Sequence, residues 1–389
     1  MMAPPTSGSA SIATALLTML IASNVTSAAE GLLLNPEVIE RLVRHGPWPP
    51  KLVNDASNRI SGRPKGIAFG EKLFFDRRLS IDKSVSCADC HQPARGWTDG
   101  RRIAKGLAVG IRNTMPVVNT RFNRWFGWDG SNDNLWAQSM RAILAPNEMG
   151  ANGHHVAEVL AADLVLRKEY ADLFGEPISP KRAETILVNI GKALASFQET
   201  LVSARTKFDT FRDALERGDW EVAARYPRRA RRGAAIFVGR GKCNVCHSGP
   251  MFTSGEFHDA GMPYFVRPGQ VDAGRFSGIT RLKASRWNLA SRWNDDPTKR
   301  GAWASRQVMK LHRNFGEFKI PSLRNLTRTD PYMHNGSIAT LHDVVRHYSE
   351  IDTERLHGDG ERLLRPLRLS PPEINDLVAF LRTLSEHDE

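Results

Sequence analysis

The chain contains very little cysteine, only four residues in 389. All four stand in two short motifs, Cys87-Ala88-Asp89-Cys90-His91 and Cys243-Asn244-Val245-Cys246-His247. If these motifs have a chemical role, no cysteine is left for a structural disulfide. The scarcity of cysteine therefore argues against a disulfide-stapled fold and makes the two repeated motifs the first candidates for function.

The order of residues in each motif is the one used to attach c-type haem. Two thiols two residues apart can form thioethers with the haem vinyl groups, and the following histidine can bind the iron. Two halves of a zinc site are a weaker interpretation, because zinc motifs rarely carry this trailing histidine. A redox dithiol is weaker still, since neither motif lies in a βαβ pattern. We therefore expect two covalent c-type haems, held by Cys87, Cys90 and His91 and by Cys243, Cys246 and His247.

Long apolar runs are also missing, and no internal stretch could span a membrane. At the N-terminus, residues 12–21 are apolar and Ser27-Ala28-Ala29 offers small residues for cleavage. This pattern predicts a signal peptide over residues 1–29, although no lysine or arginine precedes Arg41, which departs from the usual form. We expect export to the periplasm, because c-type haem is attached outside the cytoplasm.

Positive charge is in excess, with a formal net charge of +12 and a pI of about 9.8. Such a surface attracts acidic partners. Export argues against nucleic acid, so we expect an acidic protein partner. Two segments concentrate the charge: Arg225–Arg232, a solvated helix face or a docking patch, and residues 274–318, which also hold Trp287, Trp293 and Trp303.

Strand-like alternation is absent, whereas apolar residues recur at helical spacing in several segments. We expect helices over residues 155–174, over a stripe from Ile186 to Leu201 that follows a cap at Ser179, after Thr340, and after Ser370. Residues 92–123 are glycine-rich and irregular. The predicted fold is mainly α with long loops, in two cytochrome c-like haem domains. The predicted boundaries are residues 30–206 for the N-terminal domain, 207–226 for a linker and 227–389 for the C-terminal domain.

Six further stretches resemble the bacterial di-haem cytochrome c peroxidase and MauG family. They are Lys72-Leu73-Phe74-Phe75-Asp76, Arg112-Asn113-Thr114, Gly127-Trp128-Asp129-Gly130, Pro146-Asn147-Glu148-Met149-Gly150, Pro321-Ser322-Leu323-Arg324-Asn325 and Pro331-Tyr332-Met333-His334-Asn335-Gly336. The resemblance covers residues 66 to 385. Residues 274–288 further resemble the MbnH branch, MauG relatives that are paired with a copper-binding protein.

The resemblance implies roles for residues outside the haem motifs. Glu148 matches the acid and Gln138 the amide above the first haem, where peroxide is cleaved, and Trp128 matches a tryptophan between the haems. Asn113, with the carbonyl oxygens of Thr329 and Pro331, matches a calcium site between the domains.

Three features indicate the branch of the family. No histidine lies between Gln92 and Arg112, so the loop that closes the first iron in many of these peroxidases cannot do so here. Those peroxidases bind the second iron with a methionine, but at the matching position this chain has Tyr348, and MauG also has a tyrosine there. Met262 and Met333 are alternative ligands. MauG passes oxidising equivalents to its partner protein through a surface tryptophan. This chain has Gly241 at the matching position, so its route to a substrate must differ.

The implied function is an exported peroxidase-like oxidoreductase. It would use hydrogen peroxide, through a state with both irons as Fe(IV), to oxidise tryptophan on a partner protein. In the MbnH branch this means kynurenine formation in a copper-binding partner. The alternatives are a peroxidase that takes electrons from a small cytochrome, and a di-haem cytochrome that only transfers electrons.

Overall fold

The computed structural model describes residues 34–355, 358–360 and 363–386. The predicted signal peptide lies outside these residues. Helices dominate, and their bounds are α2 Pro36–Val43, α3 Pro64–Phe74, α4 Cys87–Cys90, α5 Leu135–Leu144, α6 Gly153–Ala162, α7 Leu164–Phe174, α8 Ala183–Gln198, α9 Lys207–Arg217, α10 Trp220–Ala224, α11 Arg228–Val238, α12 Arg275–Ala284, α13 Trp303–Gln307, α14 Leu341–Glu350 and α15 Pro371–Arg382. The short strands are β1 Phe257–His258, β2 Phe265–Arg267, β3 Gln270–Val271 and β4 Phe318–Lys319.

The mainly α fold with long loops is confirmed. β1 pairs antiparallel with β4, and β2 pairs with β3. No helix in the described ranges is long and apolar enough to cross a membrane.

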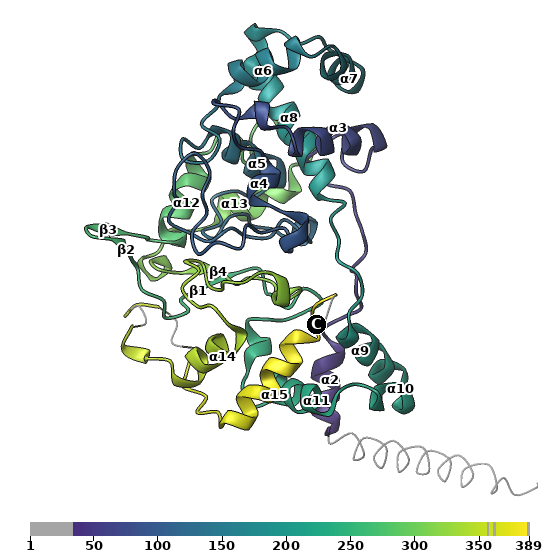
Figure 1. Cartoon of the computed structure of the whole chain (residues 1–389), viewed down its shortest axis with the longest axis vertical. Helices are drawn as coiled ribbons and strands as arrows, with labels where there is room; N and C mark the ends of the chain where they lie inside the picture. Colours follow the sequence, from purple (N-terminus) through teal and green to yellow (C-terminus); the bar gives the residue numbers. More distant parts are fainter. Residues whose placement is uncertain (1–33, 356–357, 361–362, 387–389) are drawn as a thin grey trace, which may run out of the picture.

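Two hydrophobic clusters divide the helices, one in the upper and one in the lower part of the molecule in Figure 1. The upper cluster is built from α3 and α5 to α8, with Trp136 and Tyr170 fully buried at its centre. Trp287 and Trp293 pack against it from the C-terminal half of the chain. The later segment thus contributes to the body that carries the first haem motif.

The lower cluster contains α2, α9 to α11, α14 and α15. Residues 207–226, expected as a linker, form α9 and α10 instead, and their buried side chains Phe208, Phe211 and Tyr226 belong to this cluster. α2 joins it through Leu42, although it precedes the upper body in sequence. The many charged residues in 207–226 led to the prediction of a linker, although the segment also has an apolar face that is buried in the lower cluster.

The same helix crossing occurs once in each cluster. On α3, a Cβ at Gly70 would lie 1.9 Å from the carbonyl oxygen of Ala193 on α8. On α11, a Cβ at Gly233 would lie 2.0 Å from the carbonyl oxygen of Asp376 on α15. Each helix precedes a Cys-x-x-Cys-His motif, and in each case only glycine permits such close approach of the backbones. Both halves therefore build the support of their motif in the same way.

Two predicted helix starts are confirmed and two predictions differ. Thr340 caps α14 by accepting from the Asp343 amide, and Ser370 forms a capping box with Glu373 at the start of α15. The periodic stretch 155–174 is two helices, because the Asp163 carboxylate accepts from the amides of Val165 and Leu166 and starts α7 anew. α8 begins at Ala183 after a 3₁₀ turn at Pro180–Arg182, rather than directly after Ser179.

Candidate functional site

The first haem motif lies at the start of a one-turn helix. α4 spans Cys87–Cys90, and Ser86 and Asp89 form a capping box that holds its N-terminus. The Nδ1 atom of His91 lies 3.2 Å from the carbonyl oxygen of Trp97. Burial lowers the pKa of His91. A neutral imidazole with Nδ1 engaged leaves Nε2 for a metal, which is the usual arrangement of a histidine ligand.

The second motif repeats this geometry. Cys243–Val245 forms a 3₁₀ turn, and Nδ1 of His247 lies 3.0 Å from the carbonyl oxygen of Phe252. Burial lowers the pKa of His247 to about 4. All four cysteines are free. Among the described residues no three His, Cys, Asp or Glu side chains are grouped to hold a metal ion, so the two motifs do not form one zinc site. The residues fit two separate haems.

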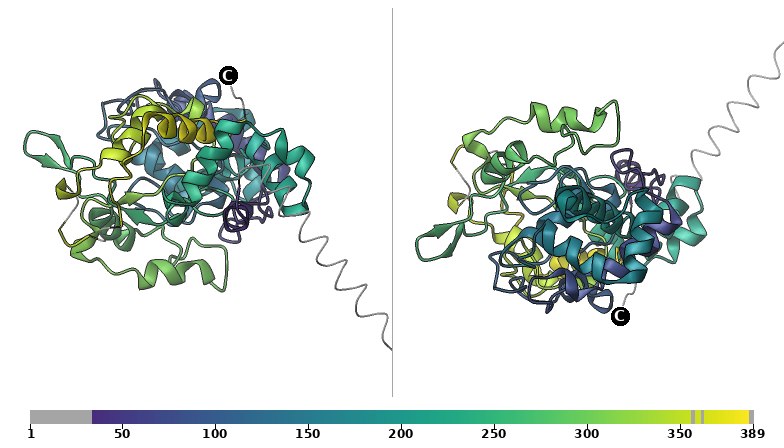
Figure 2. Two further views of the ribbon diagram at one scale, coloured as in Figure 1. Left: turned by 90° about the horizontal axis from the view of Figure 1, so that it is seen from below. Right: turned by 90° about the horizontal axis from the view of Figure 1, so that it is seen from above.

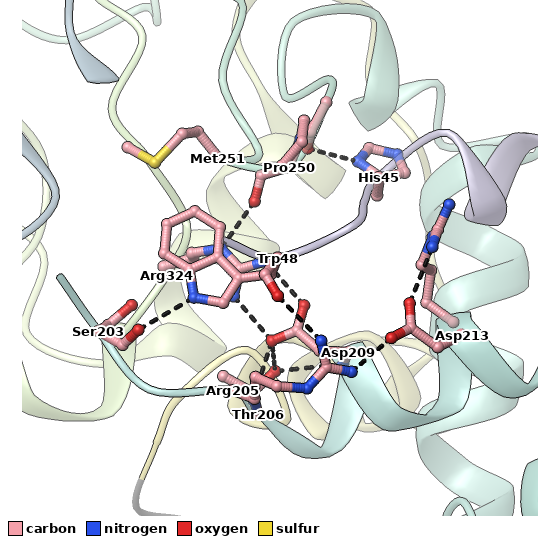
Figure 3. A network of polar contacts seen from close by, with 12 residues as sticks. His45, Trp48, Ser203, Arg205, Thr206, Asp209, Asp213, Pro250, Met251 and Arg324 are labelled. Carbon is pink, nitrogen blue, oxygen red and sulfur yellow. Dashed lines mark hydrogen bonds and ion pairs between the residues drawn. The ribbon is translucent and has the colours of Figure 1, made fainter. Parts of the chain in front are cut away.

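A buried ion pair anchors the loop that follows His247 (Figure 3). Arg324 donates to both carboxylate oxygens of Asp209, at 3.0 and 2.8 Å, and its Nε donates to the carbonyl oxygen of Pro250 at 2.6 Å. Its guanidinium lies 3.7 Å from the ring centroid of Trp48. His45 stacks on Phe252 with centroids 4.5 Å apart. Arg324 and His45 therefore hold the loop in which the Phe252 carbonyl oxygen accepts from His247.

Tyr348 lies beside the second motif. α14 buries Leu341, Val345 and Ser349 on its inner face. Burial raises the pKa of the Tyr348 phenol, and the nearby thiols of Cys243 and Cys246 act in the same direction. The phenol therefore lies near these thiols, and its binding to the iron of a haem held there stays a prediction. Met262 and Met333 stay alternative ligands.

Glu148 lies near the first motif. Glu148 acts electrostatically on His91 and on both thiols of that motif. The loop after the motif closes on it, because the amide of Leu107 donates to the Glu148 carbonyl oxygen at 3.0 Å. Gln138, on α5, accepts from the side chain of Asn132 at 2.9 Å.

Arg141 is a site residue that the sequence motifs missed. Its guanidinium binds both carboxylate oxygens of Glu148, at 2.7 and 2.9 Å. Burial acts to lower the pKa of Arg141, but Glu148 raises it above its usual value. Arg141 lies one turn after Gln138 on α5, and this i, i+3 spacing was the available signal. The pair holds Glu148 as an ordered carboxylate.

Trp128 lies where the two halves of the chain meet. Its indole nitrogen donates to the carbonyl oxygen of Asn113 at 2.9 Å, and its own carbonyl oxygen accepts from the Lys319 amide at 2.7 Å. The ring centroid is 6.4 Å from that of His334, which stacks on Phe318 at 3.4 Å. The tryptophan is thus positioned by residues from both halves.

Ion pairs surround this junction. Arg112 pairs with Asp129 at 2.6 Å and with Asp272 at 2.8 Å, and Arg281 reaches Asp129 at 2.5 Å. Burial alone would raise the pKa of Asp129, but Arg112 and Arg281 hold it below its usual range. Asp272 and Arg281 come from the C-terminal half, so the network ties the halves together beside Trp128.

The residues expected to bind calcium are only partly brought together by direct contacts. The Asn113 amide donates to the His334 carbonyl oxygen at 2.8 Å, next to the segment that contains Pro331. The Asn113 side chain donates to the carbonyl oxygen of Arg101 at 2.8 Å, which leaves its Oδ1 available as an acceptor. The Thr329 amide donates to Leu326 within a 3₁₀ turn. Calcium binding stays a prediction.

The comparisons with known proteins agree with this geometry. The model of the family "Di-haem cytochrome c peroxidase" matches residues 64–217. The methylamine utilization protein MauG of Methylorubrum extorquens is 37% identical over 325 residues, which covers 82% of this chain and 78% of that protein. Cytochrome-c peroxidase IdrP1 of a Pseudomonas species is 33% identical over 333 residues, covering 82% of this chain and 80% of the relative.

A solved structure described as a MauG-like protein associated with microbial copper homeostasis superposes with a TM-score of 0.66. It shares 25% identity, over 87% of this chain and 95% of that one. The two haem motifs, the fold and these relatives identify an oxidoreductase that acts on peroxide and carries two c-type haems. The chain belongs to the di-haem cytochrome c peroxidase and MauG family.

Proposed function

We propose that this exported, periplasmic enzyme uses hydrogen peroxide to oxidise a tryptophan of a separate protein, with kynurenine as the product in a copper-binding partner. The position of Tyr348 beside Cys243 and Cys246 carries the proposal. The MauG-like structural neighbour associated with copper homeostasis supports this class of partner.

The haems, when bound, supply the iron that reacts with peroxide and the redox capacity to hold its oxidising equivalents. The chain supplies the proton. Glu148 can accept a proton from peroxide and return it to the leaving oxygen, acting as base and then as acid. Arg141 keeps its carboxylate in one orientation through two hydrogen bonds. We propose that Gln138, whose side-chain oxygen accepts from Asn132, assists with its amide group.

Trp128 connects the two halves electronically in this proposal. An indole can be oxidised and reduced, and Trp128 is held by Asn113 on one side and Lys319 on the other. Its N–H donor bond to a carbonyl oxygen stabilises a positive charge on the ring. We propose Ca²⁺ at Asn113 and the carbonyl oxygens of Thr329 and Pro331, because oxygen ligands of mixed type suit that ion.

Tyr348 distinguishes the proposal from its main alternative. A phenolate is a hard anionic ligand and disfavours the reduced iron, whereas a methionine ligand raises the potential. A second haem held by Tyr348 would therefore retain oxidising equivalents rather than admit electrons. The relatives named as cytochrome-c peroxidases favour the alternative, peroxide reduction with electrons from a small cytochrome.

The test is peroxide treatment of the holoenzyme with proteins that co-purify with it, followed by mass spectrometry of their tryptophans. We expect kynurenine in one partner, and we expect Tyr348→His to consume peroxide while losing this modification. Because no histidine lies in residues 92–112, the resting enzyme should react without prior reduction. Rapid oxidation of a reduced small cytochrome, with unmodified tryptophans in every partner, would establish the alternative.

A further inference from the structure

Most of the excess positive charge belongs to one segment. Residues 275–313 hold ten lysines and arginines against two acidic residues, a net charge of +8, while the whole chain carries +12. Both acidic residues of the segment are half-buried. The exposed basic residues are Arg281, Lys283, Arg286, Arg292, Arg300, Arg306, Lys310 and Arg313. We refer to these eight residues as the basic face.

Part of the basic face is not neutralised by the protein itself. Arg281 pairs with Asp129, and Arg286 and Arg292 share Glu184. Among the described residues, Lys283, Arg300 and Arg306 make no ion pair. Both views of Figure 2 show the segment as green ribbon along one side of the molecule. Its charge is therefore available to a partner that approaches from that side.

A cavity of about 320 Å³ opens beside this segment. Its wall includes Arg124, Trp125, Asp133, Leu289, Arg300 and Trp303. Trp303 is 66% exposed, an unusual position for a large aromatic side chain. The volume is at the lower end of ligand-site volumes, roughly 300 to 1,000 Å³, and suits one or two side chains.

The cavity wall contains an unfulfilled hydrogen-bond donor. Trp125 is only 3% exposed, and within the described part of the chain its indole nitrogen has no acceptor. A buried polar group without a partner is costly and rare in folded proteins. That nitrogen is itself buried, and it is Arg124 and Arg300 in the same wall that favour an anionic occupant of the cavity.

Trp125 is poorly suited to carrying oxidising equivalents. The Arg275 guanidinium lies 4.6 Å from its ring centroid and that of Arg124 lies 5.3 Å away. Two cations close to the ring disfavour a positive charge on it. Trp128, three residues later, is instead stabilised by a carbonyl acceptor.

The carboxylate in the wall is already engaged. Asp133 accepts from the Ser305 hydroxyl at 2.6 Å, from the Leu289 amide at 3.0 Å and from the Asn134 side chain at 2.8 Å. Burial raises the pKa of Asp133. Its oxygens are thus engaged by donors of the protein itself.

We propose that the basic face and this cavity dock an acidic protein, with one carboxylate side chain of the partner bound between Arg124 and Arg300 beside the exposed Trp303. The inference rests on the proposed function in that the docked protein is the one oxidised. Docking here brings the partner close to Trp128, because three residues span at most about 11 Å of chain.

The test is binding of the two-haem holoenzyme, without peroxide, to an immobilised peptide of glutamates with one tryptophan, measured by surface plasmon resonance. A lysine peptide is the blank. We expect the double change Arg300→Glu with Arg306→Glu to weaken binding roughly tenfold or more. Trp303→Ala should weaken it several-fold. Binding should fall as salt is added.

The matched control is Arg228→Glu with Arg229→Glu, the same charge change at exposed residues of α11. Unchanged binding in this control supports the site, and an equal loss in both double variants overturns it as non-specific attraction. Displacement of the peptide by free glutamate with equal affinity would also overturn protein docking and leave a site for small carboxylates. Peroxide is added last. Intact docking without tryptophan oxidation supports this inference and contradicts the proposed function alone.

Discussion

At the scale of single residues, the role proposed for Glu148 depends on a neighbour. A carboxylate that moves a proton must stay close to the reacting oxygens through the reaction. Arg141 holds Glu148 by two bonds from the adjacent helix. The resemblance implied the acid, and the structure adds the Arg141 guanidinium that binds its carboxylate.

Glu148→Gln tests the proton transfer. Glutamine keeps the shape but cannot accept the proton, so we expect the second-order rate with peroxide to fall roughly 10² to 10⁴-fold. Stopped-flow spectroscopy measures the rate, and haem content from absorbance is the control. Wild-type kinetics in this variant would assign Glu148 a structural role.

We expect the free energy of unfolding to depend on pH because of the buried Glu199. Its carboxyl is 5% exposed and accepts from Ser61, and burial raises its pKa to about 7. The folded state therefore holds this proton more tightly than the unfolded chain, where glutamate titrates near 4.3. The stability from this group is complete below about pH 4.3 and is lost as pH rises through about 7.

The substitution Glu199→Gln should remove this loss of stability at high pH. We expect the variant to be more stable than the wild type at pH 8 by up to about 3 kcal/mol, and similar at pH 4. Thermal unfolding of the holoenzyme at both values measures it. The exposed Glu158→Gln is the control and should leave the pH dependence unchanged. A wild-type slope in Glu199→Gln would contradict the assignment.

At the scale of elements, the two glycine crossings are the main requirement on the helices. Gly70 on α3 and Gly233 on α11 let backbones meet where any side chain would overlap a carbonyl oxygen. Each crossing supports the loop that carries one motif. At these positions an alanine would favour the helical conformation, but its Cβ would clash with the facing helix.

Gly233→Ala separates the two effects. Helix propensity alone predicts a gain of about 1 kcal/mol, whereas a Cβ 2.0 Å from the Asp376 carbonyl oxygen forces α15 to move. We expect a net loss of roughly 1 to 3 kcal/mol, typical of an overpacked core. Thermal unfolding measures it, with Gly358→Ala as the control, because a Cβ there meets nothing within 4 Å. A stabilised Gly233→Ala would show that the crossing adjusts freely.

At the scale of the whole molecule, the halves are joined by charge beside Trp128. Arg112 is the centre of this network and pairs with carboxylates from both halves, both of them nearly buried. Removing one member of a buried ion pair leaves the others without compensation. The relative position of the halves thus depends on a few ion pairs in addition to apolar contact.

Arg112→Met should destabilise the protein by roughly 3 to 5 kcal/mol and disturb the emission of Trp128. Denaturant unfolding and fluorescence of the haem-free chain measure the two effects. Arg225→Met is the matched control, because its pair with Glu221 is solvent-exposed, and it should cost well under 1 kcal/mol. Equal losses in the two variants would show that the junction is not held by this network.

The sequence by itself determined the two haem motifs, the helical class, the family and the candidate acid at Glu148, because each depends on residue type and local spacing. It did not show that residues 207–226 join the second core, that Arg141 orients Glu148, or that Trp125 is a buried donor beside a basic face. Those features depend on which side chains meet across long separations in the chain. Only tertiary packing decides this, since burial and pairing of charges are properties of the assembled molecule rather than of any segment.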